Sequence, residues 1–378
     1  MAALSSSNEP APTLTILLCG DVMTGRGIDQ ILAHPSDPGL REFYVTDARA
    51  YVTLAERAHG PIAKPADASY IWGEALGRLR SWAPDVRVIN LETSITRSQA
   101  WENKGIHYRM HPANSACLAA AGIDCCMLAN NHVLDFGREG LVETLEALHG
   151  MHIATAGAGR TLHDATAPAI LDLGAKGRVL IFGFGCEDSG IPGRWAARPD
   201  VPGVNWLADL SERSLLNATA QILAVAQPSD ITIASIHWGS NWGYGVEDQQ
   251  RRFAQRLVAD AGVQVVHGHS SHHAKGIEIF RGCPIFYGCG DFMNDYEGIG
   301  GHEAFRPDLV LMYRVVLDLA SRRLSALTAV PFAIRRFRLR QAAAQDAQWL
   351  ATRLDRESQP FGTQVGLNPD HTLSARAR

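Results

Sequence analysis

The chain has 378 residues, of which 46% are hydrophobic and 20% are charged, and its 35 basic and 39 acidic side chains give a formal net charge of −4. This length and apolar content exclude a disulfide-stapled miniprotein and a disordered chain, because neither carries enough apolar residues for a large core. The near balance of charge excludes a dedicated nucleic-acid binder, and the lack of any run of 18 apolar residues predicts no membrane-spanning helix.

Short apolar runs alternate with helix-period segments through the first two thirds of the chain, a pattern typical of an α/β protein. Residues 14–19 predict a first strand, and apolar positions from Tyr70 onward predict a helix that Pro84 ends. Alternating elements continue to residue 266, with strands predicted at 86–91, 124–128, 169–173, 178–182, 231–236 and 263–266, and helices at 113–121, 138–148, 212–226 and 248–261.

The rhythm changes after residue 266, where predicted strands follow one another with turns between them. This spacing is typical of antiparallel strands. The strands are predicted at 277–280, 284–287, 309–319 and 324–330. No linker divides the chain, so we expect one catalytic domain over residues 13–335, with two packed sheets flanked by helices. Residues 336–378, rich in Arg, Ala and Gln, predict a C-terminal helix and a loose tail.

The N-terminus and the cysteines both bear on the cellular compartment. Residues 1–12 have neither the basic nor the apolar region of a signal peptide, and they predict a short disordered tail. The seven cysteines form no Cys-x-x-Cys pair, and several lie in apolar segments. Because buried free thiols are typical of a reducing compartment, we expect a cytoplasmic location.

Oxygen- and nitrogen-bearing side chains follow five of the predicted strands. They are Asp21, Glu92, the pair Asn131 and His132 with Asp135 close by, His237, and the histidine-rich segment 267–273. The carboxyl ends of strands form the binding crevice of an open α/β sheet, so these side chains are expected at one edge. Carboxylate, amide and imidazole groups are ligands of Zn, Mn, Fe and Mg, and imidazole favours the transition metals.

Each of these residues has an ordinary structural explanation when it is taken alone. Asp21 can cap a helix, Asn131 can hold a left-handed turn, and His132 can be a buried histidine of the core. None of these explanations accounts for five such residues placed after five strands. The combined pattern therefore predicts a metal site.

The same segments resemble the CapA-like (poly-γ-glutamate capsule biosynthesis) family, a branch of the calcineurin-like metallophosphatase fold. The resemblance covers roughly residues 14–313. Its motifs are GDVMTGRGID at 20–29, INLETSIT at 89–96, MLANNHVLDFG at 127–137, ATAGAG at 154–159, IHWGSNW at 236–242, VVHGHSSHHAKGIEIF at 265–280 and IFYGCGDFMNDYEGI at 285–299.

The resemblance implies a four-layer αββα sandwich of two packed mixed sheets, with a centre of one or two divalent metal ions (Mn, Zn, Fe, Ca or Mg). The implied ligands are Asp21, Glu92, Asn131, His237 and His269, with His272 or else His267 as a sixth. His132 then resembles the family's active-site imidazole, oriented by Asp135. Met23 and Glu92 stand where typical phosphatases have a histidine and a bridging aspartate. Both differences weaken the interpretation as a two-metal phosphoesterase and leave a single-metal site open.

One branch of the family resembles the epimerases of lasso-peptide biosynthesis. The first hypothesis is therefore a metal-dependent peptide epimerase that inverts an α-carbon of a ribosomal precursor peptide, with that peptide and other biosynthetic proteins as partners. Such an isomerase needs a Lewis acid on the carbonyl and acid–base groups on opposite faces of the carbon. His132 is one candidate, and within the segment 291–303 His302 is the other, although His302 can equally be an exposed loop residue.

The second hypothesis is a metal-dependent hydrolase or amide-bond enzyme that acts on a phosphoester or on a poly-γ-glutamate-type substrate. It uses the same ligands, and a tight pair of metal ions would favour it. A third possibility, a binding protein without activity, does not explain ligand-type residues after all five strands. Neither nucleic acid nor membrane is expected as a partner.

Four further side chains are candidates for substrate binding. Trp238 and Trp242 in the segment HWGSNW can form an apolar wall for a substrate, and Arg109 and Arg306 can bind a carboxylate. Ordinary packing of the tryptophans and ordinary solvation of the arginines are the alternatives.

Overall fold

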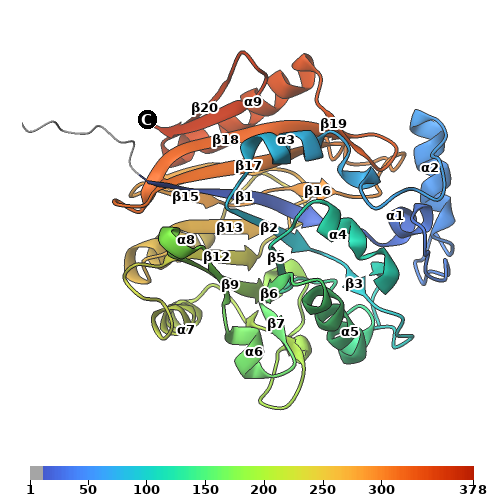
Figure 1. Ribbon diagram of the computed structural model, residues 1–378, viewed down its shortest axis with the longest axis horizontal. Coiled ribbons are helices and arrows are strands. Elements are labelled where there is room, and N and C mark those ends of the chain that lie inside the picture. The colour runs from blue at the N-terminus through green and yellow to red at the C-terminus, as the bar shows by residue number, and fades with distance from the viewer. Residues whose placement is uncertain (1–11) are drawn as a thin grey trace, which may run out of the picture.

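The apolar run at residues 14–19 forms strand β1 (Thr13–Val22), which is buried from its second residue to its last. A strand buried on both faces needs a layer on each side. In the computed structural model, which describes residues 12–378, β1 lies inside a ten-stranded mixed sheet (Figure 1). Its neighbours are β2 (Val86–Leu91), which is parallel, and β17 (Leu309–Asp318), which is antiparallel.

The first sheet has the strand order β20-β21-β18-β17-β1-β2-β5-β6, with β16 beside β1 and β19 beside β18. Its other strands are β5 (Cys125–Met127), β6 (Ala154–Ala156), β16 (Asp291–Met293), β18 (Arg323–Ile334), β19 (Leu339–Gln341), β20 (Thr363–Leu367) and β21 (Leu373–Ala377). The parallel strands β1, β2, β5 and β6 alternate with helices along the chain, as the sequence predicts. The antiparallel strands β17, β18, β20 and β21 come after residue 266, as expected.

The second sheet has seven strands in the order β11-β9-β12-β13-β15-β14, with β8 beside β9. They are β8 (Ala169–Asp172), β9 (Arg178–Cys186), β11 (Trp206–Leu207), β12 (Ile231–His237), β13 (Val265–His269), β14 (Ile277–Phe280) and β15 (Cys283–Phe286). Two small pairs join β3 (Ser94–Ile95) to β4 (Arg109–Met110) and β7 (Ala158–Gly159) to β10 (Gly203–Val204).

Helices flank the two sheets. They are α1 (Arg26–Ile31), α2 (Arg49–His59), α3 (Ala75–Trp82), α4 (Ala116–Ala120), α5 (Gly137–Gly150), α6 (Leu162–Thr166), α7 (Glu212–Leu223), α8 (Asp248–Asp260) and α9 (Ala344–Ser358). Within residues 12–378, none of the helices combines the length and the apolar character needed to cross a lipid bilayer. All seven cysteines are buried and free.

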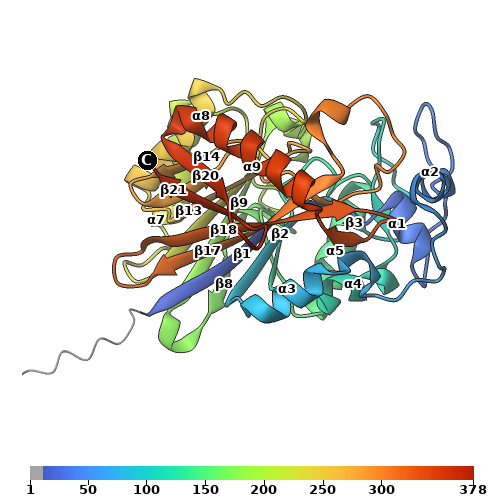
Figure 2. The same cartoon turned by 90° about the horizontal axis from the view of Figure 1, so that it is seen from above.

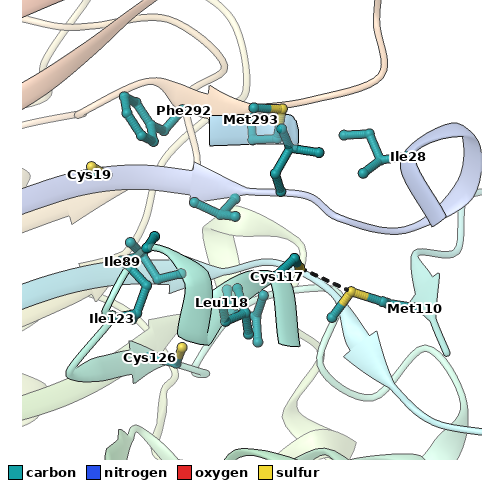
Figure 3. Close-up of a cluster of buried hydrophobic side chains, with 14 of the residues drawn as sticks. Cys19, Ile28, Ile89, Met110, Cys117, Leu118, Ile123, Cys126, Phe292 and Met293 are labelled. Atoms are coloured by element: carbon teal, nitrogen blue, oxygen red, sulfur yellow. Dashed lines mark hydrogen bonds between the residues drawn. The ribbon is translucent and has the colours of Figure 1, made fainter. Parts of the chain in front are cut away.

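Three apolar clusters show that the layers are packed in the predicted order. Leu17 and Cys19 of β1 pack with the helices α1 to α5, in the cluster that Figure 3 shows in part. Leu18 lies on the opposite face of β1 and packs with Ile181 and Ile233 of the second sheet. A third cluster joins the other face of that sheet to α7 and α8. The four-layer αββα sandwich is therefore confirmed.

The C-terminal segment differs from the expected loose tail. Strands β20 and β21 form an antiparallel pair that extends the first sheet through β18, and α9 lies beside them (Figure 2). In α9, Ala347, Leu350, Ala351 and Leu354 are all buried. These positions have the helical i, i+3, i+4, i+7 spacing of an amphipathic helix. Of the expected N-terminal tail, residues 1–11 lie outside the described residues.

Truncation of Leu354 tests whether α9 belongs to the core. Leu354 is 1% exposed and packs in the cluster between the sheets. The substitution Leu354→Ala is expected to lower the free energy of unfolding by about 2–5 kcal/mol, because it leaves a cavity in a packed interior. Leu216→Ala on α7, where the side chain is 55% exposed, is the control and should change it by less than about 0.5 kcal/mol. Equal values in urea unfolding would contradict the role of α9.

Candidate metal centre

The carboxyl ends of strands from both sheets meet at one edge of the sandwich. Asp21 lies near the end of β1, and Glu92 directly follows β2. His237 ends β12 and His269 ends β13, and these two residues are register partners in a parallel pair. His269 Nδ1 is 3.9 Å from Asp21 Oδ1, which joins the second sheet to the first. The convergence that the sequence predicts is therefore present.

The first cluster consists of Asp21, His237 and His269. One ligand atom from each of these buried residues lies within 4.8 Å of the others. The Nδ1 atoms of His237 and His269 are 2.8 Å apart, and His237 Nε2 is 3.2 Å from Asn131 Oδ1. Asn131 thus lies beside the cluster, as predicted, through its amide oxygen.

The second cluster consists of Asp21, His272 and Asp291, and again one ligand atom from each residue lies within 4.8 Å of the others. His272 Nδ1 is 2.9 Å from Asp291 Oδ1, and the other oxygen of Asp291 accepts a hydrogen bond from Asn294 Nδ2 (2.8 Å). Asp21 therefore belongs to both clusters. Asp291 was not among the predicted ligands, although it follows a glycine, as Asp21 does.

The two Gly-Asp pairs lie side by side in the fold. Strand β16 runs parallel to β1 with Asp21 opposite Asp291, and the backbone N–H of Asp21 donates to the carbonyl of Gly290 (3.0 Å). A Cβ atom on Gly20 would lie 1.8 Å from that carbonyl oxygen. Gly290 itself has a φ of +78°, which only glycine adopts readily. The repeated Gly-Asp pair is thus the sequence signal for Asp291.

The hydrogen bonds of His267 and His272 bear on which of them lies closer to a metal site. His267 Nδ1 lies 3.0 Å from the Ser235 hydroxyl, and its Nε2 lies 2.9 Å from the carbonyl of Cys19. The Ser235 hydroxyl also lies 2.9 Å from His269 Nε2 and orients that ring. Both nitrogens of His267 are thus engaged away from the clusters, so the geometry favours His272.

Glu92 lies next to both Asp21 and His132. The side-chain amide of Asn90 donates to Asp21 Oδ1 (2.7 Å) and lies 3.5 Å from Glu92 Oε2. Glu92 Oε1 is 3.7 Å from His132 Nε2. Asn90 therefore joins two predicted ligands, a role that its position inside a predicted strand does not indicate.

His132 is held by a buried carboxylate and a lysine. Its Nδ1 is 2.7 Å from Asp135 Oδ2, as predicted. Lys104 Nζ donates to Asp135 Oδ1 (2.7 Å) and lies 3.2 Å from His132 Nδ1. Tyr108 donates its backbone N–H to Asp135 (2.7 Å) and packs edge-on against the His132 ring. Lys104 was not predicted, because a lysine in a polar loop has no sequence pattern that indicates a contact with a distant histidine.

The pKa shifts show that little positive charge offsets the carboxylates of Asp21 and Glu92, and the pKa of His272 is raised because the Asp291 carboxylate outweighs the effect of burial. Burial and the nearby Asp291 carboxylate raise the pKa of Asp21 to about 7, and burial and Asp21 raise the pKa of Glu92 well above its usual value. Burial lowers the pKa values of His237 and His269 well below the usual range. Buried carboxylates with neutral imidazoles are a donor set that a divalent cation stabilises. Because imidazole is prominent, the set fits a transition metal better than calcium.

A pocket of about 170 Å³ opens beside the second cluster, and His272, Trp242 and His302 are among the residues that line it. The rings of Trp242 and His302 are stacked 3.8 Å apart at 3°. His302 thus contributes to the wall of the pocket. Among the described residues, it makes no direct contact with the three members of the first cluster. Trp242, which was predicted to bind substrate, is thus a residue of the pocket wall.

Three predicted substrate-binding residues are engaged elsewhere. Trp238 is 1% exposed and donates its indole N–H to the carbonyl of Tyr287 (3.0 Å), so it belongs to the core. Arg109 donates to the carbonyls of Ser98 and Asp37. Arg306 is paired with Asp308 and Asp346. The predictions for Trp238, Arg109 and Arg306 are therefore not supported by their positions, since carbonyls and carboxylates already satisfy their donors.

Comparisons with known proteins cover nearly the whole chain. Residues 15–296 match the family described as bacterial capsule synthesis protein PGA_cap. A probable polyglutamine synthesis accessory protein of Mycobacterium tuberculosis is 49% identical over 362 residues, 95% of each chain. The PGA biosynthesis protein CapA of Bacillus subtilis is 28% identical, over 61% of this chain and 58% of that protein. Among solved structures, a novel phosphatase from Mycoplasma pneumoniae aligns with a TM-score of 0.42 and 11% identity, over 85% of this chain and 94% of that one.

Proposed function

This chain belongs to the bacterial capsule synthesis protein PGA_cap family, and we propose that it is a metal-dependent hydrolase of amide bonds in a polyglutamyl-type polymer. One observation carries the proposal: Asp21 belongs to two buried clusters at once, next to an imidazole that a carboxylate orients. The names of the two relatives, polyglutamine synthesis accessory protein and PGA biosynthesis protein, support the choice of polymer.

The two clusters favour hydrolysis over the epimerase hypothesis. Clusters that share a carboxylate are typical of paired metal sites, whereas proton transfer at an α-carbon needs one metal ion and two free bases. Asp21, His237 and His269 would hold one ion, and Asp21, His272 and Asp291 would hold the other. Divalent ions bound there would polarise a carbonyl oxygen and activate water.

His132 is the proposed general base. An ionised carboxylate only accepts hydrogen bonds, so the bond to Asp135 requires the proton on Nδ1 and leaves Nε2 free to take a proton. Burial lowers the pKa of His132 to about 4, so the ring is neutral near pH 7. The pKa of Asp135 is held below its usual value because His132 and Lys104 outweigh the effect of burial. Nε2 lies on the Glu92 side of the ring, toward the clusters.

An isotope experiment tests the proposal against the epimerase hypothesis. The metal-loaded protein is incubated with polyglutamine or poly-γ-glutamate in deuterated water, and the products are analysed by mass spectrometry. We expect shortened chains without deuterium on any α-carbon, and a chelator should stop their formation. His132→Gln should lower the rate by about 10²–10⁴-fold without loss of metal, which is the range for removal of a general base. His163→Gln, at a side chain that is 93% exposed, is the control.

Two results would contradict the proposal. Deuterium on an α-carbon of an unshortened chain would support the epimerase, with His132 and His302 as its acid–base pair. Product formation that survives complete removal of metal would exclude the metal-dependent reaction.

A further inference from the structure

The pocket beside the second cluster is small and directly adjoins the candidate metal centre. His272 belongs to the cluster and also lines the pocket, so a group held in the pocket lies next to the centre. Its volume is about 170 Å³, below the roughly 300 Å³ at which pockets for whole small-molecule ligands begin. The pocket therefore has room for about one side chain of a longer substrate.

The walls of the pocket are flat and largely apolar. Trp242, which stacks on His302, is also tilted against the His272 ring with 5.3 Å between the centroids. Ile106 lines the pocket from another loop. Tyr44 belongs to the outer part of the lining and is 66% exposed. Such walls favour a planar group that stacks on aromatic rings.

Among the described residues that line the pocket, no lysine or arginine is free to pair with a carboxylate. Arg26 is the one lysine or arginine among them, and the carboxylates of Asp295 and Glu42 already pair with it. Its guanidinium also lies over the Tyr108 ring, 4.4 Å from the centroid. No aspartate or glutamate is part of this lining. A carboxylate placed here could accept a hydrogen bond from an amide or a hydroxyl group, but it would lose its hydration without gaining an ion pair with a lysine or arginine, which is unfavourable.

The polar groups of the lining match an amide instead. Asn241 is exposed and carries both a donor and an acceptor, and its Nδ2 lies 3.1 Å from His272 Nε2. The hydroxyl groups of Tyr108 and Tyr296, 3.3 Å apart, can each donate and accept. A carboxamide needs both kinds of partner, whereas a carboxylate can only accept.

We propose that this pocket selects an uncharged carboxamide side chain, such as that of glutamine, and rejects the carboxylate of glutamate. The pocket thereby determines which residue of the polymer is placed at the metal centre. This inference rests on the proposed function for the reaction, but the selectivity is a property of binding and is measurable without turnover.

Calorimetric titration of the full chain with two capped peptides, N-acetyl triglutamine amide and N-acetyl triglutamate amide, tests the selectivity. Triglutamine should bind at least tenfold more tightly. Tyr44→Ala and Trp242→Ala should each weaken triglutamine binding at least fivefold, because each removes part of the wall. Phe43→Ala is the matched control, since this neighbouring aromatic residue is fully exposed and does not line the pocket.

A gain-of-charge variant keeps the test independent of any damage to the wall. Ile106→Arg adds a free cation to the lining and should shift the preference at least tenfold toward triglutamate. Equal affinities, a preference for triglutamate or no measurable binding by the unmodified chain would overturn the inference, as would an unchanged preference in a folded Ile106→Arg variant. Selective binding without cleavage would contradict only the proposed function, and cleavage without selectivity would contradict only this inference.

Discussion

Asp21→Ala is expected to remove metal from both clusters and to lower the metal affinity of the chain by more than about 100-fold. Asp21 is the residue that the two clusters share, so its carboxylate cannot be replaced by the remaining members of either. Loss of a group that merely orients a metal ligand already costs 10–100-fold in affinity, and loss of a ligand costs more. Metal content is measured by plasma mass spectrometry after dialysis, together with activity.

Variants of the unshared residues separate the two clusters. His237→Ala should lose only the ion of the first cluster, and Asp291→Ala only that of the second. His267→Gln is the control for loss of a buried imidazole, because its nitrogens bond to Ser235 and Cys19. Full metal content in Asp21→Ala would refute the assignment, and equal losses in all four variants would point to a general structural effect.

The stability of the metal-free protein checks that Asp21→Ala acts through the metal. The folded state raises the pKa of Asp21 to about 7, above its unfolded value near 4, so ionisation of this group destabilises the folded chain as pH rises from about 4 to 7. Removal of the carboxyl should therefore not lower the free energy of unfolding at pH 8. A lost metal ion cannot then be explained by unfolding.

Gly20→Ala is expected to lower the free energy of unfolding by about 3 kcal/mol or more. The added Cβ would lie 1.8 Å from the carbonyl oxygen of Gly290. The backbone fixes the position of a Cβ, and the oxygen belongs to the main chain, so no rotamer change relieves the clash. Overpacking in a packed core costs about 1–3 kcal/mol, and a backbone clash lies at the upper end. Since β1 and β16 must separate, Asp291 should also move away from Asp21, and metal bound by the second cluster should be lost.

The matched control for Gly20→Ala is Gly77→Ala. Gly77 lies inside α3, and a Cβ there meets no atom within 4 Å. Alanine favours helix over glycine by about 1 kcal/mol, so this variant should be slightly stabilised. Urea unfolding curves measure both changes. A Gly20→Ala variant as stable as the original chain would show that the two Gly-Asp pairs are not packed as described.

The sequence predicted the layers and most of the candidate site for a physical reason. Asp21, Glu92, His237 and His269 follow buried strands, and the strand pattern alone places them at one edge. Asp291 was not predicted as a ligand because it begins a strand of three residues, which is too short to show an alternation of apolar and polar side chains. Its signal was the repeated Gly-Asp pair, whose meaning depends on the register of β16 against β1.

Side chains whose roles depend on distant partners could not be predicted in the same way. Arg109 and Arg306 had the right chemistry for a carboxylate, but backbone carbonyls and two aspartates satisfy them in the folded chain. Trp238 and Trp242 are four residues apart, yet one lies in the core and the other lines the pocket. The path of the loop after β12 determines which tryptophan is buried in the core and which lines the pocket.

The division of the first cluster between the two sheets also has a consequence for folding. Asp21 comes from the first sheet, and His237 and His269 come from the second, so the donors are assembled only when the sheets have docked. An ion with affinity for the docked state alone adds RT ln(1 + [L]/Kd) to its stability, about 4 kcal/mol at a thousand times Kd. Metal supply would then act on the lifetime and abundance of the folded chain in the cell, independently of any reaction at the site.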